Sequence, residues 1–298
     1  MRVAIIGGTG FVGGYLVDAL TAAGHDVAVL VRPGSEAKLR GGSNVTSVPG
    51  ELGSAKVLHG LVEGCDAVIY NVGLLREFPR QGITFEQAQF LGVVDTVSAM
   101  QEAGVRRLLL MSAIGVKHPG TRYQSTKKRA EEHALGSGLD VTVLRPSVIY
   151  GDPRGTMEFA TQLYRDMVRP PLPAVSFPGV KMSPVFIEDV ADAFVAALED
   201  DETIGKTIEL AGPEILSWDD MVTRIAAAAG RKKLLLTMPI PVMRFGATLF
   251  DWLPFYPVTR DQLTMLEEGN TASAAPLQEL IGRPPKAMTS ETLSYLAR

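Results

Sequence analysis

The chain has 298 residues, 46% of them hydrophobic, which is enough to bury the core of one large domain with an elaboration or of two modest domains. It carries 29 basic against 33 acidic residues and no long basic run, so it lacks the electrostatic footprint of a nucleic-acid-binding protein. Its one cysteine, Cys65, excludes an internal disulfide, and because the first residues read as a strand and not as a charged-then-apolar leader, we expect a cytoplasmic protein.

The first half of the chain alternates between strand and helix patterns. Residues 2–7 predict a short buried strand, residues 11–24 a helix that ends at a glycine, and residues 25–32 a second strand, which together make a βαβ unit. The alternation continues with strands at 45–48, 66–71, 106–112 and 140–146 and helices near 54–64, 85–103 and 124–137. Such alternation indicates a parallel sheet covered on both faces. We therefore predict a doubly wound α/β fold, the Rossmann fold.

The turn between the first strand and the first helix, GGTGFVG, is a candidate nucleotide site. Its glycine spacing permits a tight turn and lets backbone N–H groups and a helix N-terminus approach a pyrophosphate. A P-loop is excluded because no Lys-Ser or Lys-Thr follows, and a glycine-rich turn without a ligand is the alternative. The sequence predicts a phosphate cradle at Gly7, Gly10 and Gly13.

Arg32 ends the second strand, which is the position that distinguishes the two nicotinamide dinucleotides. A site for NAD has an acidic residue there for the ribose 2′-OH, whereas a site for NADP has an arginine for the 2′-phosphate. No aspartate or glutamate occurs in the surrounding VLVRPGS, although a solvated charge at a strand end is the alternative interpretation. The predicted cofactor is NADP(H), with NAD(H) second.

Tyr123 and Lys127 stand four residues apart at a predicted helix start, in YQSTK. This spacing places two side chains on one face of a helix. A surface Tyr/Lys pair beside the charged KKRAEE is the alternative to a functional pair.

The second half of the chain predicts a smaller unit. Prolines crowd at 169–184, where we expect the chain to leave the first unit. The predicted organisation is a dinucleotide-binding domain over 1–150, to which 185–211 returns, and a smaller substrate or partner region made of 151–184 and 212–298.

The most apolar stretch, residues 234–257, is interrupted by four prolines, Arg244 and Asp251, and does not predict a transmembrane helix. Core packing is one interpretation of the aromatic-rich block at 238–256 within it. The other is a pocket for a hydrophobic substrate, or contact with a protein partner or a membrane surface. The block contains Met238, Met243, Phe245, Phe250, Trp252, Phe255 and Tyr256.

The remaining acidic residues and histidines that could serve a site are assigned no catalytic or metal-binding role. Glu188 and Asp189 are expected to cap a helix that starts near Val190. With one cysteine and no histidine pair at i,i+4 spacing, we expect no metal site. The histidines are His25, His59, His118 and His133.

Four motifs, in order over nearly the whole chain, resemble an extended or atypical short-chain dehydrogenase/reductase of the NAD-dependent epimerase/dehydratase superfamily. They are GGTGFVG, YQSTK, LRPSVIYGDP (144–153) and SPVFIEDVADAF (183–194). Within that superfamily the chain is most similar to the group of the NADPH-binding 39 kDa subunit of respiratory complex I and its free-standing bacterial relatives. This closer resemblance is carried by AGVRRLLLMSAIG, GKTIELAGPEILSW and LPFYPVTRDQLTMLEEGN.

The resemblance implies a role for each matching residue. Tyr123 is expected to exchange a proton with a substrate oxygen, and Lys127 to hold the nicotinamide ribose and lower the pKa of the tyrosine. Ser112 is the third catalytic candidate. Asn71 and Gly73 are expected to line the cofactor path, and Pro146 and Ser147 its nicotinamide end. The full set of implied cofactor-binding residues is Gly7, Thr9, Gly10, Phe11, Val12, Gly13, Arg32, Glu51, Leu52, Asn71, Gly73, Lys127, Pro146 and Ser147.

Three positions depart from the family pattern. Ala113 stands where many extended members have the serine that hydrogen-bonds the substrate oxygen, and Ser112 falls one residue early, on the opposite face of its strand. Gln89 stands where asparagine is common, and Glu51 where aspartate is common near the adenine. Two functions stay open: NADPH-dependent reduction or isomerisation of a small apolar carbonyl or quinone-like compound, and NADPH binding for a structural, assembly or redox-sensing purpose.

Overall fold

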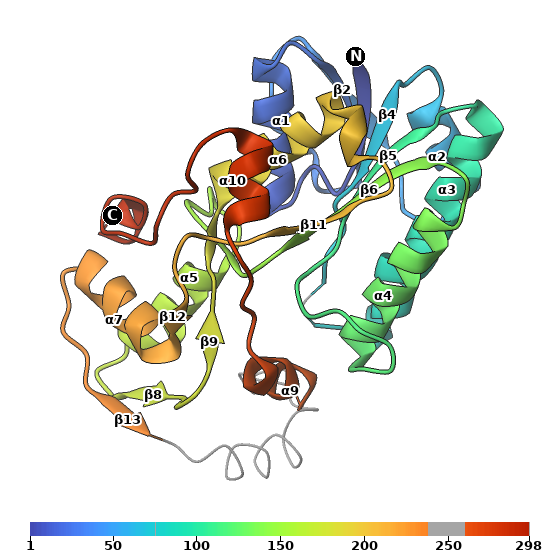
Figure 1. The fold of residues 1–298 in the computed structure, drawn as a ribbon. Coiled ribbons are helices and arrows are strands. Elements are labelled where there is room, and N and C mark those ends of the chain that lie inside the picture. The colour runs from blue at the N-terminus through green and yellow to red at the C-terminus, as the bar shows by residue number, and fades with distance from the viewer. Residues whose placement is uncertain (75, 238–259, 298) are drawn as a thin grey trace.

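The computed structural model describes residues 1–74, 76–237 and 260–297, and its centre is one parallel sheet (Figure 1). The sheet consists of β1 (Arg2–Ile6), β2 (Asp26–Val31), β3 (Val45–Pro49), β4 (Ala67–Tyr70), β5 (Arg107–Met111), β6 (Asp140–Pro146) and β11 (Thr207–Leu210). The strands follow the order β11-β6-β5-β4-β1-β2-β3, and every neighbouring pair is parallel. The strand order reverses between β1 and β4. Ligands of such sheets bind at this reversal, outside the carboxyl ends of the strands.

Helices cover both faces of the sheet, as Figure 1 shows. One face holds α1 (Phe11–Ala22), α6 (Ile187–Glu199) and α10 (Ala275–Ile281), and the other holds α2 (Ala55–Val62), α3 (Gly92–Ala103) and α4 (Arg122–Leu135). Alternate strand residues enter two separate cores, so that Leu109 packs on the α1 side and Leu108 on the α3 side. The structure confirms the predicted doubly wound α/β fold.

The predicted strands and helices of residues 1–150 all form. The helix predicted near 85–103 begins with a π-helical turn, η3 (Glu86–Leu91), before it continues as α3. The remaining described elements are η1 (Glu36–Lys38), η2 (Pro79–Gln81), β7 (Ile149–Tyr150), α5 (Phe159–Leu163), η4 (Tyr164–Val168), β8 (Ala174–Ser176), β9 (Lys181–Met182), β10 (Val185–Phe186), η5 (Asp201–Thr203), β12 (Leu216–Ser217), α7 (Trp218–Ala228), β13 (Leu235–Thr237), α9 (Arg260–Glu268) and η6 (Ser294–Ala297).

The later elements extend from the sheet edge in three short two-stranded pairings. β10 pairs with β7 and β13 with β8 in parallel, and β12 pairs with β9 antiparallel. Residues 185–211 supply β10, α6 and β11, and β11 continues the central sheet beside β6. The division of the chain into two units remains a prediction.

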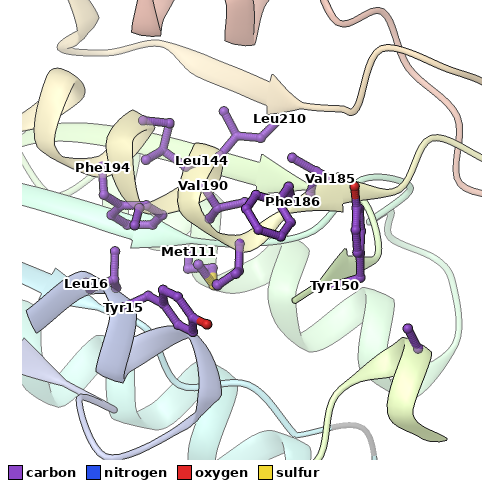
Figure 2. Close-up of a cluster of buried hydrophobic side chains, with 14 of the residues drawn as sticks. Tyr15, Leu16, Met111, Leu144, Tyr150, Val185, Phe186, Val190, Phe194 and Leu210 are labelled. Carbon is purple, nitrogen blue, oxygen red and sulfur yellow. The ribbon is translucent and has the colours of Figure 1, made fainter. Parts of the chain in front are cut away.

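The core on the α1 face continues without a break from the sheet into these later elements. Figure 2 shows Met111, Leu144 and Phe194 with Tyr150 and Phe186 in this core, between the sheet and α6. The rings of Tyr150 and Phe186 lie 5.5 Å apart between centroids. Further along the same core, Trp218 is almost fully buried. Its indole Nε1 donates a hydrogen bond to the Val175 carbonyl at 2.9 Å, which satisfies the polar end of a large apolar side chain.

The capping prediction for Glu188 and Asp189 was wrong. α6 begins at Ile187, and its N-cap is Phe186, so both acids lie in the first turn and no side chain caps the helix. Asp189 is fully buried and instead forms an ion pair with Arg283 at 2.6 Å, which binds the segment after α10 to α6. The apolar block predicted at 238–256 lies outside the described residues.

Candidate functional site

The turn after β1 has the shape of a phosphate cradle. Gly7 has a φ of +95°, and a Cβ there would lie 2.6 Å from the Asn71 carbonyl oxygen. A Cβ on Gly13 would lie 2.1 Å from the Gly7 carbonyl oxygen, so neither position accepts a side chain without a backbone shift. The chain therefore passes close to itself at the carboxyl ends of β1 and β4, where the strand order reverses.

The N-terminus of α1 is left uncapped at this turn. Gly10 is the N-cap residue and offers no side chain to the first N–H groups of the helix, which belong to Phe11, Val12 and Gly13. Thr9, half-buried, precedes it in the turn. Free N–H groups and the positive end of a helix dipole suit a phosphate group. The residues present therefore fit a dinucleotide pyrophosphate.

Asn71 ties the end of β4 to the same turn. Its backbone N–H donates to the Ile6 carbonyl at 2.8 Å, and its buried side-chain Nδ2 donates to the Gly7 carbonyl at 3.4 Å. Gly73 lies two residues further on and is exposed, with open space around its Cα. The predicted cofactor residues Asn71 and Gly73 thus lie along one edge of the cradle.

Arg32 follows β2 at the same sheet edge and is exposed, and among the described residues its side chain has no hydrogen-bond or ion-pair partner. Sequence reasoning missed a second cation, Arg40, whose Cδ lies 3.4 Å from the position of a Cβ on Gly14, in the first turn of α1. Glu51 follows β3 and is exposed, and Leu52 packs against Gly92 at the start of α3. Arg40 is also exposed and has no hydrogen-bond or ion-pair partner in the part of the chain that the structure describes. Arg32 follows the strand at whose end the sequence predicts the adenosine ribose.

Tyr123 and Lys127 lie on adjacent turns at the start of α4. A capping box between Thr121 and Gln124 fixes this helix end. The Lys127 side chain is buried, and its Nζ donates to the carbonyl oxygen of Met111, the last residue of β5, at 3.0 Å. The ammonium group lies 6.0 Å from the centre of the Tyr123 ring. The i,i+4 pair therefore faces the carboxyl end of the sheet and does not form a surface pair.

Burial sets the ionisation of both groups. It lowers the pKa of Lys127 to about 8, although the charge of Glu131 opposes this. It raises the pKa of Tyr123 to about 12, and the ring of Phe85 packs edge-to-face on the tyrosine at 5.7 Å. The resemblance implies that the charge of Lys127 lowers the pKa of Tyr123, whereas burial acts in the opposite direction. The role of the pair stays a prediction.

Ser112 turns away from the open side of this edge. Its side chain is 4% exposed, and its Oγ has no hydrogen-bond partner among the described residues. It lies under α4 beside Gln89 and Lys127. Ala113 is half-exposed and takes the opposite orientation along the chain. The edge therefore carries the methyl group of Ala113 at the position where the resemblance implies a serine hydroxyl.

Gln89 is buried, and both ends of its side-chain amide form hydrogen bonds within the protein. Its Nε2 donates to the Leu74 carbonyl at 3.1 Å, and its Oε1 accepts from the Thr126 hydroxyl at 2.8 Å. It thereby joins the π-helical turn to α4, one turn from Tyr123.

A scan of protein families matches residues 7–201, more than half of the chain, to the model described as NAD(P)H-binding. The chain belongs to the NAD(P)H-binding family. The match begins in the glycine cradle and includes α4, so the family model covers the residues whose geometry is given above.

Individual comparisons agree with this NAD(P)H-binding family. The chain is 26% identical to NADH dehydrogenase [ubiquinone] 1 alpha subcomplex subunit 9 of Arabidopsis thaliana, over 89% of this chain and 68% of that protein. It is 28% identical to the ceramide reductase of Caulobacter vibrioides, over 84% of this chain and 78% of the reductase. Among solved structures, gox2253 has a TM-score of 0.76 at 21% identity, covers 99% of this chain and is itself covered to 96%, which shows the shared fold.

The end of β6 meets a segment of this NAD(P)H-binding protein that sequence reasoning did not place at the site. Ser147 follows Pro146 and is buried, and its Oγ donates to the Asn270 carbonyl at 3.2 Å. The Asn270 Nδ2 reaches the Ile114 carbonyl at 3.4 Å, and its Oδ1 is buried without a partner. Asn270 thus stands between the loops that follow β5 and β6.

Glu268, two residues earlier, contacts the start of α4. Its two carboxylate oxygens bind Lys117 Nζ at 2.6 Å and Gln124 Nε2 at 2.7 Å, and these hydrogen bonds hold the pKa of the carboxyl below its usual range. We refer to Glu268, Gly269 and Asn270 as the strap. No spacing rule connects position 268 to position 124, so only the three-dimensional structure could reveal it.

Neither a metal-binding cluster nor a membrane-spanning helix occurs among the described residues. No group of three or more His, Cys, Asp or Glu side chains there is arranged to hold a metal ion. No helix in the same ranges has both the length and the apolar character needed to cross a membrane.

Proposed function

We propose that the protein reduces the carbonyl group of a small, mostly apolar compound with NADPH. One observation carries the proposal: Tyr123 and Lys127 share a helix face at the sheet edge that also holds the uncapped glycine cradle, with Lys127 bound to the last residue of β5. A dinucleotide with its pyrophosphate at α1 extends along this edge toward α4.

The choice of NADPH rests on charge. Arg32 at the end of β2 and Arg40 beside the first turn of α1 have no ion-pair partner among the described residues, and a 2′-phosphate adds negative charge at this edge. Glu36, the acid nearest in sequence after Arg32, accepts a hydrogen bond from the Gly34 N–H at 3.2 Å. The end of β2 therefore offers no aspartate or glutamate to accept a hydrogen bond from the ribose 2′-OH of NAD.

When bound, NADPH would supply the hydride that a carbonyl carbon needs for reduction to an alcohol, and would leave as NADP⁺. Tyr123 gives its hydroxyl proton to the carbonyl oxygen, so that the product is an alcohol. Lys127 is mostly protonated at neutral pH, since its pKa is about 8, and its positive charge stabilises the tyrosinate that remains. Phe85 gives the tyrosine an apolar wall, and the similarity to a protein named ceramide reductase supports an apolar substrate.

Binding of NADPH without turnover is the second candidate. Ala113 and the inward Ser112 leave the substrate oxygen without the serine donor, and loss of one such donor costs about 2.7–4 kcal/mol of transition-state stabilisation. The similarity to a protein named as a subunit of NADH dehydrogenase supports a role in a protein assembly. This candidate needs only the cradle and Arg32.

The two candidates differ in NADPH consumption. The native chain, Tyr123→Phe and Ala113→Ser are mixed with NADPH and a panel of apolar aldehydes, ketones and quinones, and the fall in NADPH absorbance is followed. Turnover that is lost in Tyr123→Phe and raised in Ala113→Ser supports the reductase. Turnover that is indifferent to Tyr123 refutes its role, and NADPH binding with no turnover in any variant supports the second candidate.

A further inference from the structure

A basic apolar patch lies at the far side of the molecule from the N-terminus, where Figure 1 shows β8 and β13 side by side. We define this patch by three leucines and three cations: Leu172, Leu234, Leu236, Arg169, Arg231 and Lys232. The two segments are joined by the Ala174 N–H, which donates to the Leu234 carbonyl at 2.8 Å, and by Arg231, which donates to the Arg169 carbonyl at 3.1 Å.

The leucines of the patch are exposed to an extent that core packing does not explain. Leu172 is 70% exposed, Leu234 66% and Leu236 55%. Leu235 lies between the latter two and packs against the core, so the alternation of the strand turns Leu234 and Leu236 outward together. Single exposed leucines are common, but these three lie on two neighbouring segments that β8 and β13 pair.

The charges that the two patch segments themselves carry are of one sign. Residues 167–187 and 221–237 contain six lysines and arginines and no acidic residue, in a chain whose net charge is −4. Arg169, Arg231 and Lys232 are exposed and form no ion pair among the described residues. The acids that border these segments already have partners: Asp166 pairs with Arg165 at 2.8 Å, and Glu188 with Lys286 at 2.6 Å. Asp219 accepts from Ser176 of β8 at 2.8 Å, and Asp220 from Ser217 at 2.6 Å.

We propose that this patch docks the protein on the surface of a lipid bilayer that contains anionic phospholipid. Exposed leucines insert at the boundary between headgroups and acyl chains, while lysine and arginine bind the headgroup phosphates. An acidic protein surface would satisfy the cations but would leave three leucines without an apolar phase. Neither the cradle nor Tyr123 belongs to the patch, so the proposal stands independently of the proposed reaction.

Vesicle sedimentation tests the docking with the full chain and without turnover. Phosphatidylcholine vesicles with phosphatidylglycerol should sediment the native protein, and vesicles of phosphatidylcholine alone should do so much less. Each cation near an anionic surface strengthens partitioning about fivefold, so Arg231→Glu with Lys232→Glu should weaken it by about 25-fold or more. Leu234→Ser with Leu236→Ser should weaken it by about tenfold or more.

Control variants carry changes of the same kind away from the patch. Lys56→Glu with Lys206→Glu reverses two exposed charges, and Ile204→Ser removes an exposed apolar side chain. These variants should bind within about threefold of the native chain, and circular dichroism should show that all variants fold. Equal binding to neutral and anionic vesicles, patch variants that bind like the native chain, or equal losses in the controls would overturn the proposal.

Discussion

Gly13 and Gly10 provide a matched pair of alanine substitutions in the cradle. A Cβ on Gly13 would lie 2.1 Å from the Gly7 carbonyl oxygen and 2.6 Å from the Gly8 Cα, which are backbone atoms that cannot rotate away. A Cβ on Gly10 meets only the Gly7 carbonyl oxygen, at 3.5 Å, which is an ordinary contact. The structure therefore predicts a clear loss of stability for Gly13→Ala and little change for Gly10→Ala.

The expected size for Gly13→Ala follows from two opposing effects. Overpacking against fixed atoms costs about 3 kcal/mol, whereas alanine favours a helix over glycine by about 1 kcal/mol. The net loss of about 2 kcal/mol lowers the melting temperature by about 4–8 °C in a chain of this size class. Gly10→Ala should change stability by less than about 1 kcal/mol, since only its N-cap position is affected.

Thermal unfolding by circular dichroism and NADPH titration by fluorescence separate the two variants. Gly13→Ala should lose stability and NADPH affinity together. Gly10→Ala should keep its stability but bind NADPH more weakly, because the added methyl stands among the free N–H groups of α1. Native stability in Gly13→Ala would refute the close backbone approach, and native affinity in Gly10→Ala would refute phosphate binding at this helix end.

Three further predictions concern charges around the site. Arg32→Ala should reduce the preference for NADPH over NADH by about ten- to a hundredfold, as measured by titration with both nucleotides, and an unchanged ratio would contradict the charge argument. Turnover should fall as pH rises through about 8, since Lys127 then loses its proton; a flat profile up to pH 10 would contradict the role of Lys127. Glu268→Gln should lower kcat with a stability change below about 1 kcal/mol, because the pair with Lys117 is partly exposed, while Glu279→Gln on α10 is the control. An unchanged kcat would show that the strap does not position α4.

The sequence predicts the sheet half of the molecule well because its signals are local. Apolar runs, helical periodicity and the glycine spacing each depend on residues close in the chain. Six of the seven strands of the sheet form at these patterns, and the seventh, β11, belongs to the segment 185–211 that is expected to return to the domain. The i,i+4 pair of Tyr123 and Lys127 is equally local, and its placement at the end of β5 follows from the alternation of strand and helix.

The remainder of the site depends on contacts that are distant in sequence. Glu268 reaches Gln124, and Asn270 reaches Ser147, across more than a hundred residues. The local sequence pattern predicts that Asp189 caps a helix, but in the structure Asp189 forms an ion pair with Arg283, which is distant in sequence. The pKa of Tyr123 depends on burial by Phe85 and its surroundings, which residue spacing alone does not reveal.

The central claim is that Tyr123 and a bound NADPH together reduce an apolar carbonyl. NADPH deuterated at the transferred position is incubated with the panel of apolar carbonyls, and the alcohols formed are analysed by mass spectrometry for the native chain and Tyr123→Phe. The account predicts an alcohol that carries one deuterium on the former carbonyl carbon, formed at least about a hundredfold more slowly by Tyr123→Phe. NADPH binding in both proteins with no deuterated product from either, or equal rates from both, would contradict it.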